Sequence, residues 1–226
     1  MKSFRALSAL LSYPAEELKE AIPDIRRILA EEDVVSRKAL VALEPLLQLL
    51  ESTDVLAAQE NYVLLFDRSR SLSLNLFEHV HGESRDRGGA MVDLLQMYQD
   101  SGFELVGSEL PDHLPVLLEY LSTRDKTEAR TILADAGAIL AALADRLARR
   151  ETPYAGVLAA LAEFADARST TEQAAALMAE PLDNLAATLF GGRQVTCQHP
   201  AARHVEPLPQ ADAATDVEGE ADLRRH

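Results

Sequence analysis

The segment LFEHVHGESRDRG, residues 76–88, concentrates side chains that could bind metal or transfer protons. Its ionisable residues are Glu78, His79, His81, Glu83, Arg85, Asp86 and Arg87. His79 and His81 would point about 200° apart on a helix but to the same side of an extended chain, where nearby carboxylates could add ligands. The pattern permits a metal-dependent hydrolase, but it does not specify the three or four ligands that such a site needs.

Other catalytic patterns fit this segment poorly. Ser84 lacks the surroundings of a nucleophile elbow, and Gly88-Gly89 lacks the lysine and the spacing of a phosphate-binding loop. A solvated loop that caps the next helix, through Ser84 or Asp86, is the structural alternative. Each glycine in a first helical turn costs roughly 0.5–1 kcal/mol relative to alanine. The glycine pair therefore favours close approach of another backbone, either a neighbouring helix or a bound peptide.

Composition limits the partners. The chain has 226 residues, 47% of them hydrophobic, and a formal charge of −15. This charge disfavours nucleic acid and anionic membrane surfaces and attracts basic peptides. A single cysteine, Cys197, excludes an intrachain disulfide and a Cys-rich metal site and fits a reducing cytoplasm. No stretch is apolar enough for membrane insertion, and the first residues are better explained by an amphipathic helix than by a signal peptide.

Apolar residues recur at helical spacing over most of the chain, which predicts an all-α fold without strands. Pro23 and Pro45 are expected to bend or split their helices, and Gly102 is a plausible helix stop. The apolar stripes predict helices over residues 4–11, 18–29, 40–50, 55–66, 91–98, 114–121, 132–147, 154–164 and 181–190. We expect one helical domain over residues 1–190.

Residues 191–226 differ in composition. They contain prolines, scattered acids and few large apolar side chains, so they cannot bury enough surface to offset the entropy of ordering. The sequence predicts a disordered tail. Cys197, His199 and His204 lie there, and they are interpreted as tail residues rather than as metal ligands.

Two segments carry a family resemblance. ENYVLLFDRSRSLSLNLFEHVHGESRDRGGAMVDLLQMY, residues 60–98, resembles the signature of the NarJ family, the assembly chaperones of respiratory nitrate reductase, also called delta chains. SELPDHLPVLLEYL, residues 108–121, is similar to a second family motif, an acidic-Pro-Asp-His loop that opens a helix. The family belongs to the TorD/DmsD group of redox-enzyme maturation proteins, which implies a single TorD-like helical bundle.

The resemblance also implies a function. Family members are cytoplasmic, bind the N-terminal segment of a molybdenum enzyme's catalytic subunit, and hold the apo-enzyme while molybdenum cofactor and iron–sulfur clusters are inserted before membrane docking. The implied partner is the N-terminus of the nitrate reductase catalytic (alpha) subunit, with molybdenum cofactor insertion proteins as further candidates. No catalysis and no cofactor of its own are implied.

We hypothesise that the client segment enters an apolar groove as an amphipathic helix. The expected floor is Tyr62, Phe66, Leu76 and Phe77, and the expected acidic rim is Glu78, Glu83, Asp86 and Asp112. Arg85 and Arg87 would contact the client or pair internally with Glu83 or Asp112. His79, His81 and His113 would make binding pH-dependent, with His113 a neutral core histidine as the alternative. Tyr62 and Phe66 could instead belong to the core.

Three other functions stay open at this point. One is a metal-dependent hydrolase that uses His79 and His81. Another is a permanent structural subunit of a membrane enzyme. The third is a maturation chaperone for a different molybdoenzyme, because nothing in the residues themselves fixes the client.

Overall fold

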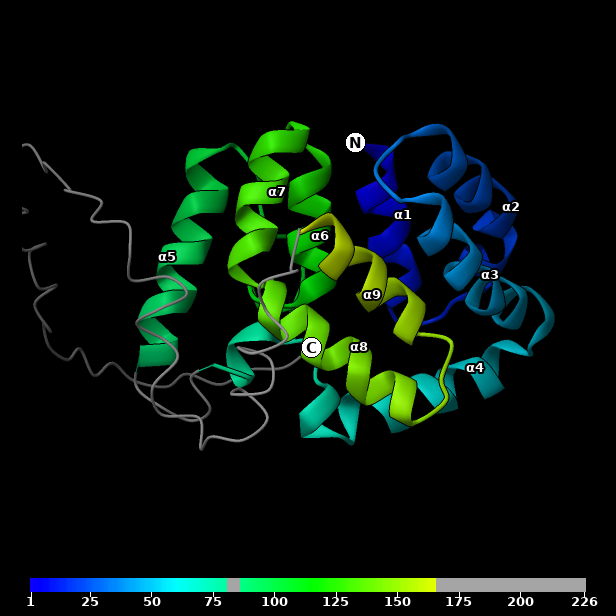
Figure 1. The fold of residues 1–226 in the computed structure, drawn as a ribbon. Coiled ribbons are helices and arrows are strands. Elements are labelled where there is room, and N and C mark those ends of the chain that lie inside the picture. The colour runs from blue at the N-terminus through cyan, green and yellow to red at the C-terminus, as the bar shows by residue number, and fades with distance from the viewer. Residues whose placement is uncertain (81–85, 166–226) are drawn as a thin grey trace, which may run out of the picture. The chain divides into compact units, whose positions relative to one another are not determined.

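The computed structural model describes residues 1–80 and 86–165, and the described chain is all-helical (Figure 1). Its elements are α1 (Lys2–Leu11), α2 (Glu16–Glu31), α3 (Arg37–Ser52), α4 (Val55–Tyr62), η1 (Val63–Asp67), η2 (Arg70–Leu72), η3 (Leu76–Glu78), α5 (Asp86–Asp100), α6 (Leu114–Ser122), α7 (Lys126–Asp135), α8 (Gly137–Arg149) and α9 (Ala155–Phe164). The extended pairing in the described part is one isolated antiparallel bridge, between Asn75 and His113. The predicted fold class is confirmed.

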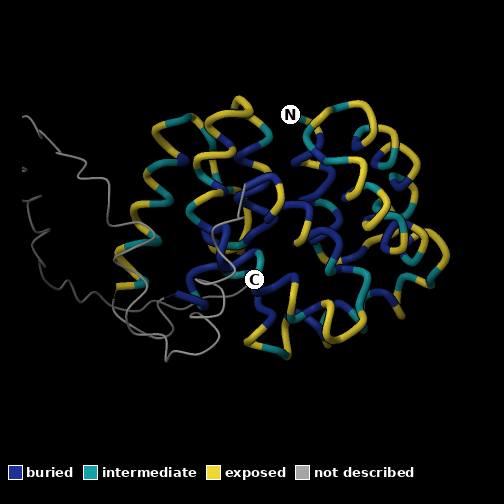
Figure 2. Tube along the Cα trace, viewed as in Figure 1, coloured by how far each residue is buried: buried dark blue, intermediate teal, exposed yellow. Residues whose placement is uncertain are grey.

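The core is built from the predicted apolar stripes. α1 packs mainly against α6, and α9 packs against α8 and α3. Figure 2 shows buried positions concentrated on the facing sides of these helices. Aliphatic side chains fill most of the interior, and edge-to-face aromatic pairs such as Phe4–Phe164, with ring centroids 5.1 Å apart, complete it.

Helix boundaries follow local capping chemistry. Asp54 accepts hydrogen bonds from the backbone N–H groups of Leu56 and Ala57, and Asp125 does the same for the first turn of α7. Pro23 and Pro45 lie inside α2 and α3 without ending either helix, so the expected splitting does not occur. A proline removes one backbone donor, and packing of the surrounding turns compensates for that loss.

Two helices replace the single one expected over residues 132–147. α7 ends at Asp135 and α8 begins at Gly137, with Ala136 between them in a turn. The apolar stripe continues across the junction because Leu133 and Leu140 are both fully buried. Periodicity alone therefore could not reveal the break.

α5 is the least buried of the long helices. Tyr98 is its one fully buried residue, whereas Val92 is 65% exposed. Gly102 follows with φ +72°, a left-handed conformation that confirms the predicted helix stop. The predicted helix over residues 181–190 and the tail lie outside the described residues. None of the helices in residues 1–80 and 86–165 combines the length and apolar character needed to cross a bilayer.

Candidate functional site

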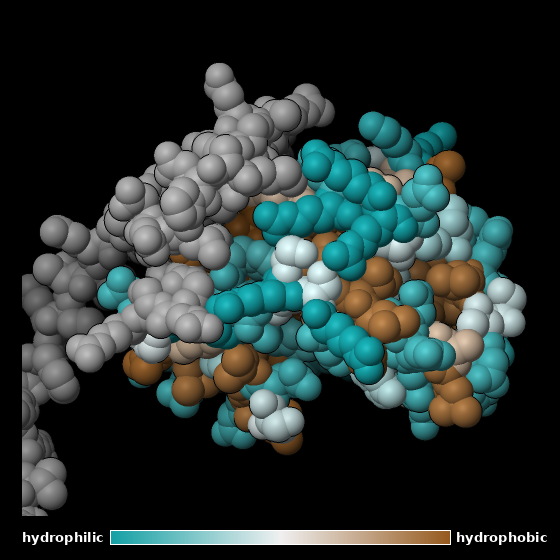
Figure 3. All heavy atoms as spheres, turned by 90° about the horizontal axis from the view of Figure 1, so that it is seen from below, coloured by the Kyte–Doolittle hydropathy of each residue, from teal (hydrophilic) through white to brown (hydrophobic). Residues whose placement is uncertain are grey.

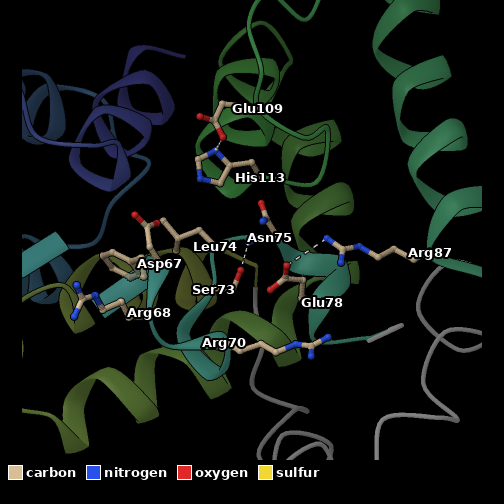
Figure 4. A pocket seen from close by; sticks show the side chains of 11 residues that line it. Asp67, Arg68, Arg70, Ser73, Leu74, Asn75, Glu78, Arg87, Glu109 and His113 are labelled. Carbon is tan, nitrogen blue, oxygen red and sulfur yellow. Dashed lines mark hydrogen bonds and ion pairs between the residues drawn. The ribbon is translucent and has the colours of Figure 1, made fainter. Parts of the chain in front are cut away.

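A pocket of about 620 Å³ lies where η1, η2 and η3 meet the start of α6. It is lined by Phe66, Asp67, Arg68, Arg70, Ser73, Leu74, Asn75, Glu78, Arg87, Glu109 and His113. Figure 4 shows carboxylates and guanidinium groups intermixed around this space, with Asp67 beside Arg68 and Glu78 paired with Arg87. All the lining residues fall within the two segments that resemble the NarJ signature, residues 60–98 and 108–121.

A turn of π-helix shapes one wall. α4 passes directly into η1, and the Arg68 N–H donates to the carbonyl of Val63, five residues earlier, at 3.0 Å. The wider turn inserts one residue into the helical repeat, and such turns are frequent at functional sites. Phe66 is buried on one side of it, while Asp67 is exposed.

Backbone hydrogen bonds join the other two walls. The Leu76 N–H donates to the Asp112 carbonyl at 3.0 Å, and the Leu114 N–H donates to the Leu74 carbonyl at 2.9 Å. These bonds flank the bridge between Asn75 and His113. They fix the η3 segment against the first turn of α6, so both segments present side chains to one pocket.

Asp112 is not a rim residue, which corrects the sequence interpretation. Its side chain is fully buried, and Oδ2 accepts a hydrogen bond from the Phe77 N–H at 2.9 Å. Oδ1 has no hydrogen-bond partner within the described chain. Burial raises the pKa of this carboxyl above its ordinary range, against the lowering effects of that hydrogen bond and of Arg87. Asp112 therefore anchors η3 and does not face an incoming peptide.

Glu78 and Arg87 meet at the pocket wall. Arg87 reaches from the first turn of α5 to Glu78 Oε1, and the two atoms are 3.4 Å apart (Figure 4). Both side chains are about four-fifths buried, so their interaction is screened less than a surface ion pair. The internal partners expected for Arg87 were Glu83 and Asp112, so the pairing with Glu78 was not predicted. Both residues line the pocket, and their contact with a client stays a prediction.

His79 is a core histidine. It is buried, and its Nε2 lies 2.8 Å from the carbonyl oxygen of Ser73. Because a carbonyl only accepts, the imidazole donates from Nε2 and cannot serve as a base there. The Ser73 hydroxyl instead accepts from the Asn75 N–H, so the pair does not form a nucleophile and its base. Burial lowers the pKa of His79.

His113 lies at the pocket with its Nδ1 3.4 Å from Glu109 Oε2. Burial lowers the pKa of the imidazole, while Glu109 and Asp67 oppose that shift. The ring is therefore neutral at neutral pH, and its contact with Glu109 becomes an ion pair only on protonation. The neutral state agrees with one alternative considered for His113, and a pH-sensitive contact with the client stays a prediction.

Only one of the four residues expected to form the apolar floor lines the pocket. Phe66 lines the pocket, whereas Tyr62, Leu76 and Phe77 are buried and do not line it. Tyr62 contacts the rings of Tyr13, Phe66 and Tyr154, and its hydroxyl donates to the Leu11 carbonyl. Its core alternative is therefore confirmed.

Within residues 1–80 and 86–165 nothing lies close to the glycine pair. A Cβ built on Gly88 or Gly89 would meet none of their atoms within 4 Å, so no helix of this part of the chain packs closely against the pair. A bound peptide as the reason for the glycines stays a prediction. Asp86 is exposed at the start of α5. His81, Glu83 and Arg85 lie outside the described residues, and within the described ones there is no group of three potential metal ligands.

Several lining residues were not expected from the sequence. The η1–η3 region contributes Asp67, Arg68, Arg70, Ser73, Leu74 and Asn75, and the loop before α6 contributes Glu109. The sequence could have indicated these residues only through their position, because they lie inside the two motif segments. The chemistry of individual residues did not distinguish Asp67 from any other exposed acid, because the π-helical turn that presents it has no clear sequence pattern.

The fold and the pocket define an all-helical domain with a cavity lined by both carboxylates and guanidinium groups. Residues 14–160 match the family described as nitrate reductase delta subunit, and the chain belongs to that family. It is 42% identical over 174 residues to the nitrate reductase molybdenum cofactor assembly chaperone NarJ of Escherichia coli K12, covering 77% of this chain and 74% of that protein.

Two further relatives agree with this assignment. The chain is 39% identical to the probable nitrate reductase molybdenum cofactor assembly chaperone NarW of E. coli K12, over 73% of this chain and 68% of that one. It is 32% identical to the probable chaperone NarJ of Bacillus subtilis, over 69% and 84%. The family predicted from residues 60–121 is confirmed.

Proposed function

We propose that this protein is a cytoplasmic, non-catalytic assembly chaperone. It binds the N-terminal segment of the apo catalytic subunit of nitrate reductase and holds the enzyme competent for insertion of molybdenum cofactor and iron–sulfur clusters before membrane docking. The observation that carries the proposal is the family match over residues 14–160, which includes every residue that lines the pocket. The relatives' names support the same role.

The pocket supports a specific mode of binding. Asp67, Glu78 and Glu109 offer carboxylates to basic residues of the client, while Phe66 and Leu74 contact its apolar face. A disordered segment loses roughly 2–5 kcal/mol on ordering. The expected affinity is therefore moderate, about micromolar to tens of nanomolar, or roughly −8 to −10 kcal/mol. Moderate affinity also permits release once the cofactors are in place.

Calorimetric titration tests the client. The purified chain is titrated with peptides from the N-termini of the catalytic subunits of nitrate, dimethyl sulfoxide and trimethylamine oxide reductases. We expect heat of binding with the nitrate reductase peptide and little with the others. Preference for another peptide would assign a different molybdoenzyme, and indifference to all three would contradict the proposal.

Matched variants test the pocket. Asp67→Asn/Glu109→Gln removes two pocket carboxylates, and Glu17→Gln/Glu20→Gln removes two exposed carboxylates on α2. Each charge pair near the surface contributes about 0.2–1 kcal/mol, so the pocket variant should bind the peptide roughly two- to thirtyfold more weakly. Its binding should also depend less on salt. Equal effects of the two variants would remove the pocket from the binding site.

Two cellular measurements test the alternatives. A tagged chain should capture the catalytic subunit from cells but be absent from the mature membrane complex, whereas a permanent subunit would remain in that complex. Stoichiometric zinc or iron in the purified protein, together with hydrolytic turnover, would favour the hydrolase instead.

A further inference from the structure

The most buried carboxylate that lines the pocket already has a cationic partner. Glu78 Oε1 lies 3.4 Å from Nη2 of Arg87, and both side chains are about four-fifths buried. The other two carboxylates of the lining, those of Asp67 and Glu109, are exposed. At Glu78, a basic side chain of a client therefore meets a carboxylate that the protein has paired with a cation of its own.

The contact between Arg87 and Glu78 is a weak one for its kind. Within the described residues, a single nitrogen of the Arg87 guanidinium donates to a single oxygen of Glu78, at 3.4 Å. A charge-assisted hydrogen bond between such groups is ordinarily about 2.7–2.9 Å long, and a guanidinium that meets a carboxylate face on makes two of them. An incoming guanidinium with that geometry would bind Glu78 better than Arg87 does.

The turn that carries Arg87 is also easily lost from its helix. Arg87 lies in the first turn of α5, where the helix dipole disfavours a positive charge. Gly88 and Gly89 follow it, and glycine is a poor helix former. Both glycines are exposed, and a Cβ on either would meet no described atom within 4 Å. Little packing therefore opposes the release of Arg87 from the pocket wall.

We propose that Arg87 determines which segments the pocket accepts, by holding Glu78 until a basic side chain of the client takes its place. This inference rests on the proposed function and adds a requirement to it. The exchange avoids leaving a largely buried carboxylate unpaired, which is costly. A segment without a basic residue cannot replace Arg87, so it leaves Glu78 occupied.

Apolar contact alone would select clients poorly. Phe66 and Leu74 offer the pocket's apolar contacts, and any amphipathic segment could use them. On the side of the molecule that Figure 3 shows, hydrophilic residues cover much of the centre, with smaller apolar groups among them. The exchange at Glu78 therefore supplies a discrimination between basic and neutral segments that the apolar residues lack.

Calorimetric titration of two matched variants tests the exchange. Arg87→Gln leaves Glu78 without its internal partner, whereas Arg27→Gln removes an exposed cation on α2 that pairs with Asp24 and Glu31. Both variants change the net charge equally. Arg87→Gln should bind the nitrate reductase peptide about three- to thirtyfold more tightly, and Arg27→Gln should change its affinity less than about twofold. Arg87→Lys, which restores a cation, should lose most of the gain.

The gain should depend on charge at both partners. A copy of the peptide with every arginine and lysine replaced by glutamine should bind Arg87→Gln no more tightly than wild type. In a Glu78→Gln background, Arg87→Gln should produce little further change, as a double-mutant cycle would show. Salt gives a third measure, because wild type exchanges one ion pair for another while Arg87→Gln forms a new one. Its affinity should therefore fall more steeply with salt.

The glycines are tested in the same titration. Gly88→Ala/Gly89→Ala favours the helical first turn, so it should weaken binding of the basic peptide about two- to tenfold. The loss should disappear when Arg87→Gln is added, because nothing then needs to be released. A loss that persists in that background would show that the added methyl groups obstruct the client and would remove the glycines from the exchange.

Several outcomes would overturn the role of Arg87. Weaker binding by Arg87→Gln would mean that Arg87 contacts the client directly, and an equal gain in Arg27→Gln would reduce the effect to net charge. Unchanged affinity in Arg87→Gln, with the peptide still bound, would refute this inference and leave the proposed function intact. Peptide binding by neither wild type nor Arg87→Gln would refute both. Circular dichroism should show every variant folded.

Discussion

Replacing Asp112 separates its hydrogen bond from its charge. Asp112→Ala removes the acceptor of the Phe77 N–H, and Asp112→Asn keeps an acceptor while removing the charge. An unpaired buried donor costs about 1–3 kcal/mol, and for a chain of this size 1 kcal/mol shifts Tm by about 2–4 °C. Asp112→Ala should therefore lower Tm by roughly 2–12 °C. Asp112→Asn should be at least as stable as the wild type at pH 8, because no charge is then buried.

The pH dependence gives an independent check. Because burial raises the folded-state pKa of Asp112, the folded protein binds more protons at this carboxyl than the unfolded chain does as pH rises above about 3.9. This contribution to stability is fully present below the unfolded pKa and is lost as pH rises through the folded pKa. The Asn variant should therefore gain stability relative to wild type as pH rises.

Thermal unfolding gives the Tm change and urea unfolding gives the stability difference, each followed by circular dichroism at pH 5 and pH 8. The reasoning fails if Asp112→Asn destabilises as strongly as Asp112→Ala, since the negative charge itself would then be required. In that case the interaction with Arg87, which lowers the pKa, would outweigh the cost of burial.

Three further predictions concern stability. Gly156→Ala should destabilise by about 1–3 kcal/mol in urea unfolding, because its Cβ would overlap the Ala42 carbonyl where α9 crosses α3; unchanged stability would show that the helices separate freely. Asp125→Ala should cost about 1 kcal/mol by removing the α7 cap, and Asp125→Ser should restore most of it. Burial lowers the pKa of His79, so the unfolded chain takes up protons first and stability should fall as pH decreases below about 6.5. A His79→Gln variant should show a shallower fall between pH 6.5 and 5, and an equally steep one would assign that slope to other groups.

The sequence predicted the helices well because amphipathic periodicity is local. The stripe in residues 4–11 became α1, and Phe4, Leu7, Leu10 and Leu11 are all buried. The π-helical turn at Val63–Asp67 was not predicted, since it inserts a residue without changing the apolar pattern.

The site was predicted only in part because its contacts are not local. Asp112 reads as an exposed acid in a polar loop, yet its partner is the amide of Phe77, 35 residues away. The hydrogen bond from Arg146 to the Ser71 carbonyl is similar, because it joins residues that are 75 apart in the sequence. Local charge singled out the region as a candidate site but could not predict which charges face inward.

The bridge between Asn75 and His113 has a consequence for how a guest enters. Two walls of the cavity, the η3 segment and the start of α6, are joined by backbone hydrogen bonds. Separating them would break the bonds from Leu76 to Asp112 and from Leu114 to Leu74. If the pocket receives the client as proposed, the easiest entry is along an edge without such backbone bonds. Arg87 and Glu78 meet at one of these edges through their side chains alone.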